Sequence, residues 1–166
     1  MGIQIDYSLE TKPLSTIAPL ALIPDLPEHF LLMNGDVLTD LNFRQLCSDH
    51  VRENRLFTIA AAQRKHKVDY GVLHVNGGEL AGFEEKPSVE YRVSTGIYAV
   101  SRRVLEFIPA DTKYGFDNLM RDMLAGGHRV HVAPHDGYWL DIGRPDDYMQ
   151  AIDEFGNRKE QFLLNG

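Results

Sequence analysis

A polar turn that ends in a carboxylate, Asn34-Gly35-Asp36, follows directly on the apolar run Phe30-Leu31-Leu32-Met33. The apolar run is typical of a buried strand, and a carboxylate at the carboxyl end of such a strand can bind a metal in the crevice of an α/β sheet. Asn and Gly tolerate positive φ and Asp closes turns by side-chain hydrogen bonds, so the segment is also ordinary turn chemistry. Taken alone, the segment is better explained as an ordinary turn. Asp36 remains a candidate metal ligand because it follows the carboxyl end of a predicted strand.

Three further polar segments follow where strands are expected to end or begin. They are Gly82-Phe83-Glu84-Glu85-Lys86-Pro87, Ser94-Thr95-Gly96-Ile97-Tyr98, and residues 137–145, which read G-Y-W-L-D-I-G-R-P. The last contains a second carboxylate, Asp141. Two carboxylates at sheet edges, Asp36 and Asp141, can share Mg²⁺, a hard cation that prefers oxygen ligands and phosphate. Asp141 is equally suited to cap the helix expected from Pro145, because Asp is common just before helices.

Read in this order, the four segments resemble the sugar-1-phosphate nucleotidyltransferases, and the resemblance runs from about Ile3 to Tyr148. It implies that Asp36 and Asp141 hold Mg²⁺ or Mn²⁺ and that Lys86 binds the phosphate of the sugar, these three being the catalytic candidates. The implied substrate contacts are Gly35, Tyr70, Gly71, Glu85, Thr95 and Gly96. Taken in isolation, the E-E-K-P segment is also compatible with a solvated strand end.

Two departures from the family pattern accompany the resemblance. The family's opening signature, G-x-G-T-R-L followed by P-K-P, cradles the nucleotide phosphates, and it does not occur in this sequence. Where the family has E-x-x-P-L-G-T-A-G-A-L, residues 10–20 read E-T-K-P-L-S-T-I-A-P-L, so both glycines that allow close backbone approach are replaced. We therefore expect residues 1–166 to form a single nucleotidyltransferase-like domain that is incomplete at its N-terminus and has little activity alone.

Hydrophobic patterning predicts alternating strands and helices, hence an α/β fold with a Rossmann-like, mixed and mostly parallel sheet that has helices on both faces. The expected strands cover residues 3–7, 30–34, 57–63, 70–75, 79–85, 95–101, 130–133 and 138–140, and the expected helices cover 16–23, 42–53, 116–124 and 145–155. Asn76-Gly77-Gly78 predicts a hairpin. Thr39 or Asp40 can cap the helix at 42–53.

The missing signature also bears on assembly. In the family it begins with a strand inside the sheet, so without it the strands at 3–7 and 30–34 lack a neighbour. Unpaired strand edges are templates for another chain. We therefore expect a homo-oligomer in which a partner covers the exposed sheet.

Composition and charge argue against nucleic-acid binding and against insertion in a membrane. A formal charge of −7 and a pI near 5.4 argue against a nucleic-acid partner, which requires a basic patch. No apolar run approaches the roughly 20 residues of a membrane span and no signal peptide is visible, so we expect a cytoplasmic protein that does not insert in a membrane. Cys47 is the only cysteine and is expected to be an inert core thiol.

Three functions fit these observations. The first is a sugar-1-phosphate nucleotidyltransferase whose metal and sugar-phosphate portion is this chain. The second is a noncatalytic relative that binds a nucleotide sugar or a sugar phosphate. The third, a metal-dependent glycosyltransferase, usually carries a D-x-D pair, and Asp36-Val37-Leu38 lacks the second aspartate.

Overall fold

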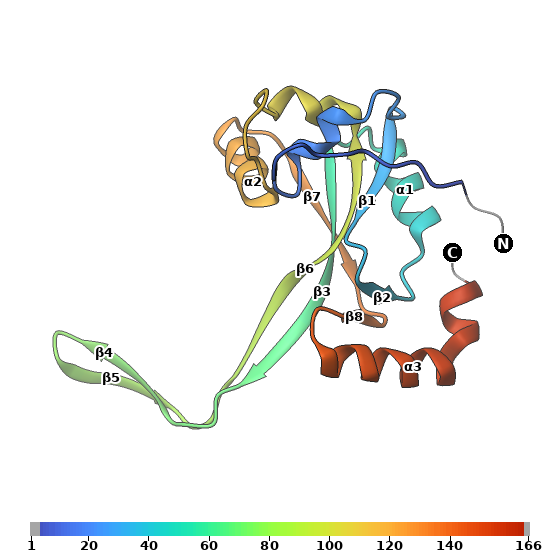
Figure 1. Cartoon of the computed structure of the whole chain (residues 1–166). Coiled ribbons are helices and arrows are strands. Elements are labelled where there is room, and N and C mark those ends of the chain that lie inside the picture. The colour runs from blue at the N-terminus through green and yellow to red at the C-terminus, as the bar shows by residue number, and fades with distance from the viewer. Residues whose placement is uncertain (1–3, 165–166) are drawn as a thin grey trace.

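A four-stranded mixed sheet forms the centre of the computed structural model, which describes residues 4–164 (Figure 1). Its strands are β1 (His29–Met33), β6 (Ser88–Ser101), β3 (Phe57–Lys67) and β7 (Val130–His135), in that order. Since β6 is antiparallel to β1 and β3, and β3 is parallel to β7, three of the four strands run in one direction. The predicted mixed α/β sheet is confirmed, and two of its three strand pairings are antiparallel.

Helices cover both faces of this sheet, as predicted. On one face, α1 (Phe43–Arg52) packs Leu46 against Ala60 and Ile97 of the central strands. On the other, α2 (Phe116–Ala125) and the 3-10 helix η1 (Ala18–Leu22) pack against Phe57 and other buried residues of β3 and β6. The inner halves of β3 and β6 are largely buried, because helices cover both faces of the sheet there.

A long two-stranded arm leaves the sheet where β3 and β6 continue beyond it (Figure 1). Their pairing runs on from Gln63 opposite Arg92 to Lys67 opposite Ser88. Beyond that point β4 (Val72–Asn76) and β5 (Glu79–Glu84) form the predicted hairpin, a separate two-stranded antiparallel sheet. Both β3 and β6 are therefore longer than the sequence pattern predicts.

Two short strands and the last helix lie beside the base of the arm (Figure 1). Short strands β2 (Val37–Thr39) and β8 (Trp139–Asp141) pair with each other, and α3 (Pro145–Leu164) follows, with non-helical backbone at Arg158. A further 3-10 helix, η2 (Arg102–Phe107), follows β6. Among residues 4–164, no helix combines the length and apolar character that crossing a bilayer requires.

Three sequence predictions near the N-terminal half were wrong. Residues 4–10 have no regular structure and pair with no strand, and Tyr7 and Leu9 are 92% and 87% exposed. Residue 3 lies outside the described residues. The expected helix at 16–23 is only the five-residue η1, since Pro24 disfavours helical backbone at Ile23. The cap of α1 is Asn42, whose Oδ1 accepts from the Gln45 amide at 2.9 Å, and neither Thr39 nor Asp40.

Candidate functional site

Of the two candidate metal ligands, Asp141 lies on β8, and Asp36 directly precedes β2, the strand that pairs with β8. Val37 of β2 is opposite Asp141 of β8, and the Ile142 amide donates to the Asp36 carbonyl oxygen at 2.8 Å. Both Asp36 and Asp141 are exposed. Residues 105 positions apart in sequence are thus brought side by side by two three-residue strands.

The Ser94-Thr95-Gly96 segment lies against the Asn34-Gly35-Asp36 turn. The Asn34 amide donates to the Gly96 carbonyl oxygen at 2.9 Å. Gly96 has φ +74°, and a Cβ there would lie 2.6 Å from Asn34 Nδ2, so the turn can sit this close only because residue 96 is glycine. Thr95 is buried and its hydroxyl donates to the Ala60 carbonyl oxygen at 2.9 Å, which fixes the segment on the sheet.

Trp139 joins the second carboxylate to this segment. Its indole Nε1 donates to the Thr95 carbonyl oxygen at 2.8 Å. The Arg64 guanidinium lies over the indole ring, 4.6 Å from its centroid, and donates to the Trp139 carbonyl oxygen at 3.2 Å. Trp139 therefore packs against this segment and against Arg64, and in packing it positions β8 and hence Asp141.

Asp40 holds the start of β8 from the other side. Its Oδ1 accepts from the Tyr138 amide at 2.7 Å and lies 3.2 Å from His135 Nε2. A Cβ at Gly137 would lie 2.3 Å from the same oxygen, so glycine is needed there. Asp40 and Arg64 were missed by sequence reasoning, because contacts between residues this far apart along the chain leave no local signal.

Asp141 does not cap α3. Its Oδ1 accepts from the Gly143 amide at 3.1 Å, whereas the first helical residue is Pro145 and the position before it is Arg144. The carboxylate therefore shapes the turn that precedes the helix, and its other oxygen has no protein partner among the described residues. That oxygen can accept a further ligand.

The second group of predicted residues lies at the base of the β4–β5 hairpin. A Cβ at Gly71 would lie 2.6 Å from the Phe83 ring and 3.2 Å from Glu85 Oε2, so this residue is packed under its neighbours. Tyr70 is 79% exposed. Lys86 is exposed and has φ +46°, so Glu85 and Lys86 form a turn that follows β5 and are not part of an extended strand.

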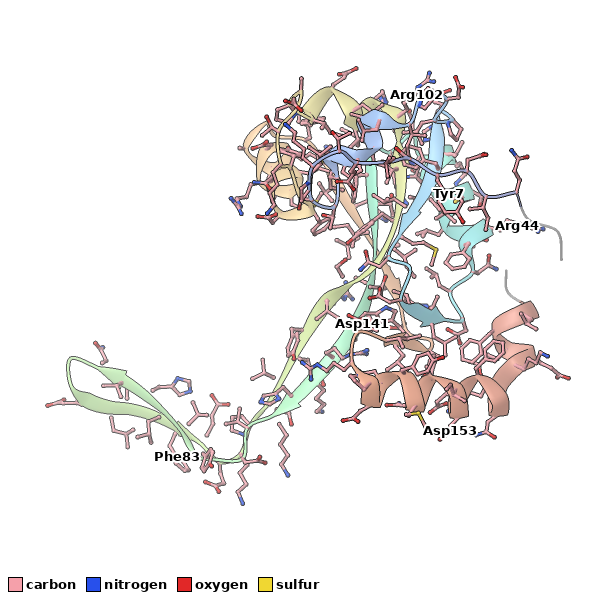
Figure 2. The ribbon with its side chains drawn as sticks, in the orientation of Figure 1. Tyr7, Arg44, Phe83, Arg102, Asp141 and Asp153 are labelled. Carbon is pink, nitrogen blue, oxygen red and sulfur yellow. The ribbon has the colours of Figure 1, made fainter. Side chains whose placement is uncertain are left out.

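The structure brings together the residues within each group and keeps the two groups apart. Asn34, Asp36, Thr95, Gly96 and Asp141 gather where the arm leaves the sheet. Eight residues of extended β6 separate Gly96 from Ser88, beside the Lys86 turn, which at about 3.3 Å per residue is about 26 Å. Figure 2 shows the same separation between Asp141, at the base of the arm, and Phe83, far out along it.

Comparison with known proteins agrees with this fold and motif order. The nucleotidyl transferase family profile matches residues 1–158. The catalytic subunit beta of mannose-1-phosphate guanylyltransferase from Drosophila pseudoobscura pseudoobscura is 31% identical over 159 residues, which are 92% of this chain and 43% of the relative. Mannose-1-phosphate guanyltransferase from Yarrowia lipolytica is also 31% identical over 159 residues, 90% of this chain and 43% of the relative.

Solved structures show the same fold. HddC from Yersinia pseudotuberculosis superposes with a TM-score of 0.60 at 23% identity, over 88% of this chain and 64% of that one. A putative glucose-1-phosphate thymidylyltransferase from Bacillus anthracis superposes with a TM-score of 0.52 at 18% identity, over 75% and 53%.

These similarities define the chain as a nucleotidyltransferase-like α/β protein. It belongs to the nucleotidyl transferase family, among the sugar-1-phosphate nucleotidyltransferases that its motifs resemble. The chain spans less than half the length of the curated relatives that it matches.

Proposed function

We propose that this chain is the metal and sugar-phosphate portion of a sugar-1-phosphate nucleotidyltransferase. The observation that carries the proposal is the convergence of three motifs at the base of the arm, with Asp36 directly before β2 and Asp141 on β8, the strand that pairs with β2. In the reaction, a sugar-1-phosphate oxygen forms a bond to the α-phosphorus of a nucleoside triphosphate. The bond from that phosphorus to the β-phosphate breaks, and pyrophosphate leaves.

The relatives favour one substrate pair. The curated relatives that match over about nine tenths of this chain are named as mannose-1-phosphate guanylyltransferases. We therefore propose mannose-1-phosphate and GTP as the substrates and GDP-mannose as the nucleotide sugar.

The donor set at the base of the arm fits Mg²⁺ or Mn²⁺ that is shared with substrate. Within residues 4–164, no group of three His, Cys, Asp or Glu side chains is placed to hold a metal. Asp36 and Asp141 alone supply two exposed carboxylates. Mg²⁺ is usually bound through one or two carboxylates, with waters and substrate phosphates completing its coordination. When bound, the cation would offset the repulsion between two anionic substrates.

The protein's own groups have positioning tasks. Asp36 and Asp141 are held by backbone pairing and by Trp139, so little reorganisation is needed when charge develops on the transferring phosphoryl group. Lys86 is proposed to neutralise the sugar phosphate, and Glu85 to accept hydrogen bonds from sugar hydroxyls. Gly35, Tyr70-Gly71 and Thr95-Gly96 are the proposed remaining substrate contacts. The Lys86 turn lies about 26 Å along β6 from Gly96. For Lys86 to neutralise the sugar phosphate during the reaction, either the arm must bend or the sugar phosphate must bind at Lys86 first.

A second function, binding without catalysis, is favoured by one observation. The 166 residues contain no G-x-G-T-R-L segment to hold the nucleotide phosphates. Removing one preorganised donor from a charge-stabilising site costs roughly 10² to 10³ in rate, and several would be lacking here. We therefore propose that the chain alone binds nucleotide sugar or sugar phosphate and turns over little substrate.

Metal and ligand binding test the proposal. We expect Mn²⁺ to bind weakly to the chain alone and more tightly with GDP-mannose present, measured by calorimetry. Asp36→Asn and Asp141→Asn should each reduce Mn²⁺ affinity at least tenfold, and Asp153→Asn, an exposed carboxylate on α3, should not (Figure 2). Unchanged Mn²⁺ binding in both variants would refute the metal site. Robust pyrophosphate release from GTP and mannose-1-phosphate would refute the expected inactivity.

A further inference from the structure

A hollow lies at the end of the sheet away from the candidate metal site, and we call it the arginine hollow. Its volume is about 730 Å³, which is the size of a small-molecule site. Figure 2 shows Arg102, directly before the lining residue Arg103, well away from Asp141. The lining includes three arginines, two histidines and one carboxylate: Arg55, Arg103, Arg129, His128, His131 and Glu53.

Strand pairing brings the three arginines to the same place. The strands β3 and β7 begin side by side, with Phe57 opposite Val130, and Arg55 and Arg129 come just before these two residues. Arg103 joins them because β6 ends beside the start of β3 and continues into η2. Residues from three separate connections of the chain therefore line one hollow.

The three arginines have no carboxylate partner. None of them forms an ion pair among residues 4–164. Glu53, the carboxylate in the lining, is itself paired with Arg52, at 3.3 Å. Asp and Glu outnumber Lys and Arg by 24 to 17 in this chain, so partners for cations are plentiful. Three unpaired guanidinium groups in one hollow are therefore a local excess of positive charge.

The same charge acts on a histidine of the lining. The pKa of His131 is lowered from its ordinary value, first by burial and next by Arg55. Glu53 and Asp49 raise it, and each of these two effects is smaller than that of Arg55. Arg55 is thus the largest electrostatic influence on His131, as expected of a cation that no carboxylate neutralises.

Donors in the hollow are available and partly fixed in place. Arg103 Nη2 donates to the Asn54 carbonyl oxygen at 3.3 Å and to Asn54 Oδ1 at 3.1 Å, and its Nε donates to Ser101 Oγ at 3.1 Å. These bonds hold the guanidinium, and its Nη1 makes no hydrogen bond among the described residues. The guanidinium groups of Arg55 and Arg129 make none there either. A planar guanidinium can donate two parallel hydrogen bonds to the oxygens of a phosphate.

We propose that the arginine hollow binds a phosphoryl group through its three arginines. A phosphoryl group fits three guanidinium groups better than a carboxylate does, because it has more acceptor oxygens and carries more than one negative charge at pH 7. The hollow is larger than this group alone needs, and Leu56, Leu124 and Val130 give it an apolar wall. We therefore expect the phosphoryl group to belong to a phosphorylated small molecule. This site is separate from the proposed metal site and does not depend on it.

Calorimetry with glucose-6-phosphate and with inorganic phosphate tests the proposal. The double variant Arg55→Gln, Arg129→Gln removes two guanidinium groups that make no hydrogen bond in the fold. Its affinity for both probes should fall by at least about tenfold, because charge-assisted hydrogen bonds are lost. The double variant Arg44→Gln, Lys113→Gln removes the same charge at exposed positions outside the hollow and should bind both probes like the wild type (Figure 2). Glucose without phosphate should not bind.

Proton NMR of the imidazole rings locates the bound probe. The signals of His128 and His131, assigned with His128→Asn and His131→Asn, should shift when glucose-6-phosphate is added to the wild type. They should stay in place in Arg55→Gln, Arg129→Gln, and circular dichroism melting curves show that each variant is folded.

The two probes distinguish the sources of the phosphoryl group. Tighter binding of glucose-6-phosphate supports a phosphate ester as the ligand, and tighter binding of inorganic phosphate supports free phosphate. The proposal is overturned if neither probe binds the wild type at millimolar concentration. Equal affinities in the wild type and in Arg55→Gln, Arg129→Gln would also overturn it, because the phosphoryl group would then bind elsewhere.

Discussion

Asn34 and Gly96 are in backbone contact, with the Asn34 amide donating to the Gly96 carbonyl oxygen at 2.9 Å and no space for a Cβ between them. This contact links the turn that carries Asp36 to the strand that carries Thr95. Thr95 in turn accepts from the indole of Trp139, two residues before Asp141. Two hydrogen bonds therefore link the turn that carries Asp36 to the strand that carries Asp141.

Gly96→Ala should displace the Asn34 turn. Alanine at φ +74° is strained, and its Cβ would meet Asn34 Nδ2 at 2.6 Å, so we expect a loss of about 1–3 kcal/mol in the free energy of unfolding. Urea denaturation measures this loss. Trp139 is the only tryptophan and is bonded to residue 95, so its emission should also shift. Gly35→Ala, where no atom lies within 4 Å of an added Cβ, is the matched control, and an equal loss there would contradict this account.

Trp139→Phe should loosen β8 while keeping an aromatic ring in place. Phenylalanine cannot donate to the Thr95 carbonyl oxygen, and a lost hydrogen bond of this kind costs about 1 kcal/mol. Because Asp141 is two residues away, Mn²⁺ affinity should fall as well. Tyr138→Phe is the control: its buried hydroxyl has no hydrogen-bond partner among the described residues, so its removal should leave stability unchanged or raise it. Full Mn²⁺ affinity in Trp139→Phe would show that Asp141 is positioned independently.

Local patterns predicted the elements whose burial is periodic. The apolar spacing from Phe43 to Val51 predicted α1, and Asn76-Gly77-Gly78 predicted the hairpin, because each depends on neighbours a few residues away. The strand expected at residues 3–7 was wrong for residues 4–7, because alternating apolar residues form a stable strand only when they pair with other strands, and these residues pair with none. The outer part of β3, residues 63–67, is polar because both of its faces meet solvent, so no apolar signal marked it.

The motifs of the candidate site could be predicted from the sequence, but their arrangement in space could be predicted only in part. The order of the four segments identified the family, which the comparisons show. The adjacency of Asp36 and Asp141 depends on β2, which was not predicted because three residues carry too little pattern. The distance between the Lys86 turn and the base of the arm follows from the extended length of β6, a tertiary property that motif spacing does not contain.

Lys86→Ala should weaken sugar-phosphate binding more than nucleotide binding, because the lysine is proposed to meet only the phosphate of the sugar. Loss of a charge-assisted contact costs about 1.5–3 kcal/mol, or roughly 10- to 150-fold in affinity. Titration with mannose-1-phosphate and with GTP measures the two affinities separately. Lys113→Ala, an exposed lysine outside the arm, controls for the change in net charge. Equal affinities for mannose-1-phosphate in wild type and Lys86→Ala would assign Lys86 to the solvated surface.

His50 should make the fold sensitive to acid. Its side chain is fully buried, with Nδ1 2.9 Å from the Thr58 hydroxyl and Nε2 without a partner among the described residues. Burial, followed by the nearby His29 and the arginines Arg55 and Arg103, lowers the pKa of His50 to about 4 from 6.5. Since the folded pKa lies below the unfolded one, the unfolded chain binds more protons between these values, and stability falls as the pH drops from 6.5 to 4.

A difference of this size corresponds to about 3 kcal/mol, fully lost below pH 4. Urea denaturation at pH 7.0, 5.5 and 4.5 should show His50→Asn losing markedly less stability on acidification than the wild type, because asparagine can still pair with Thr58 and does not titrate. His66→Asn, at an exposed position on the arm, should follow the wild-type curve. Parallel pH profiles for wild type and His50→Asn would mean that the buried imidazole is protonated without cost, through water or rearrangement around His29.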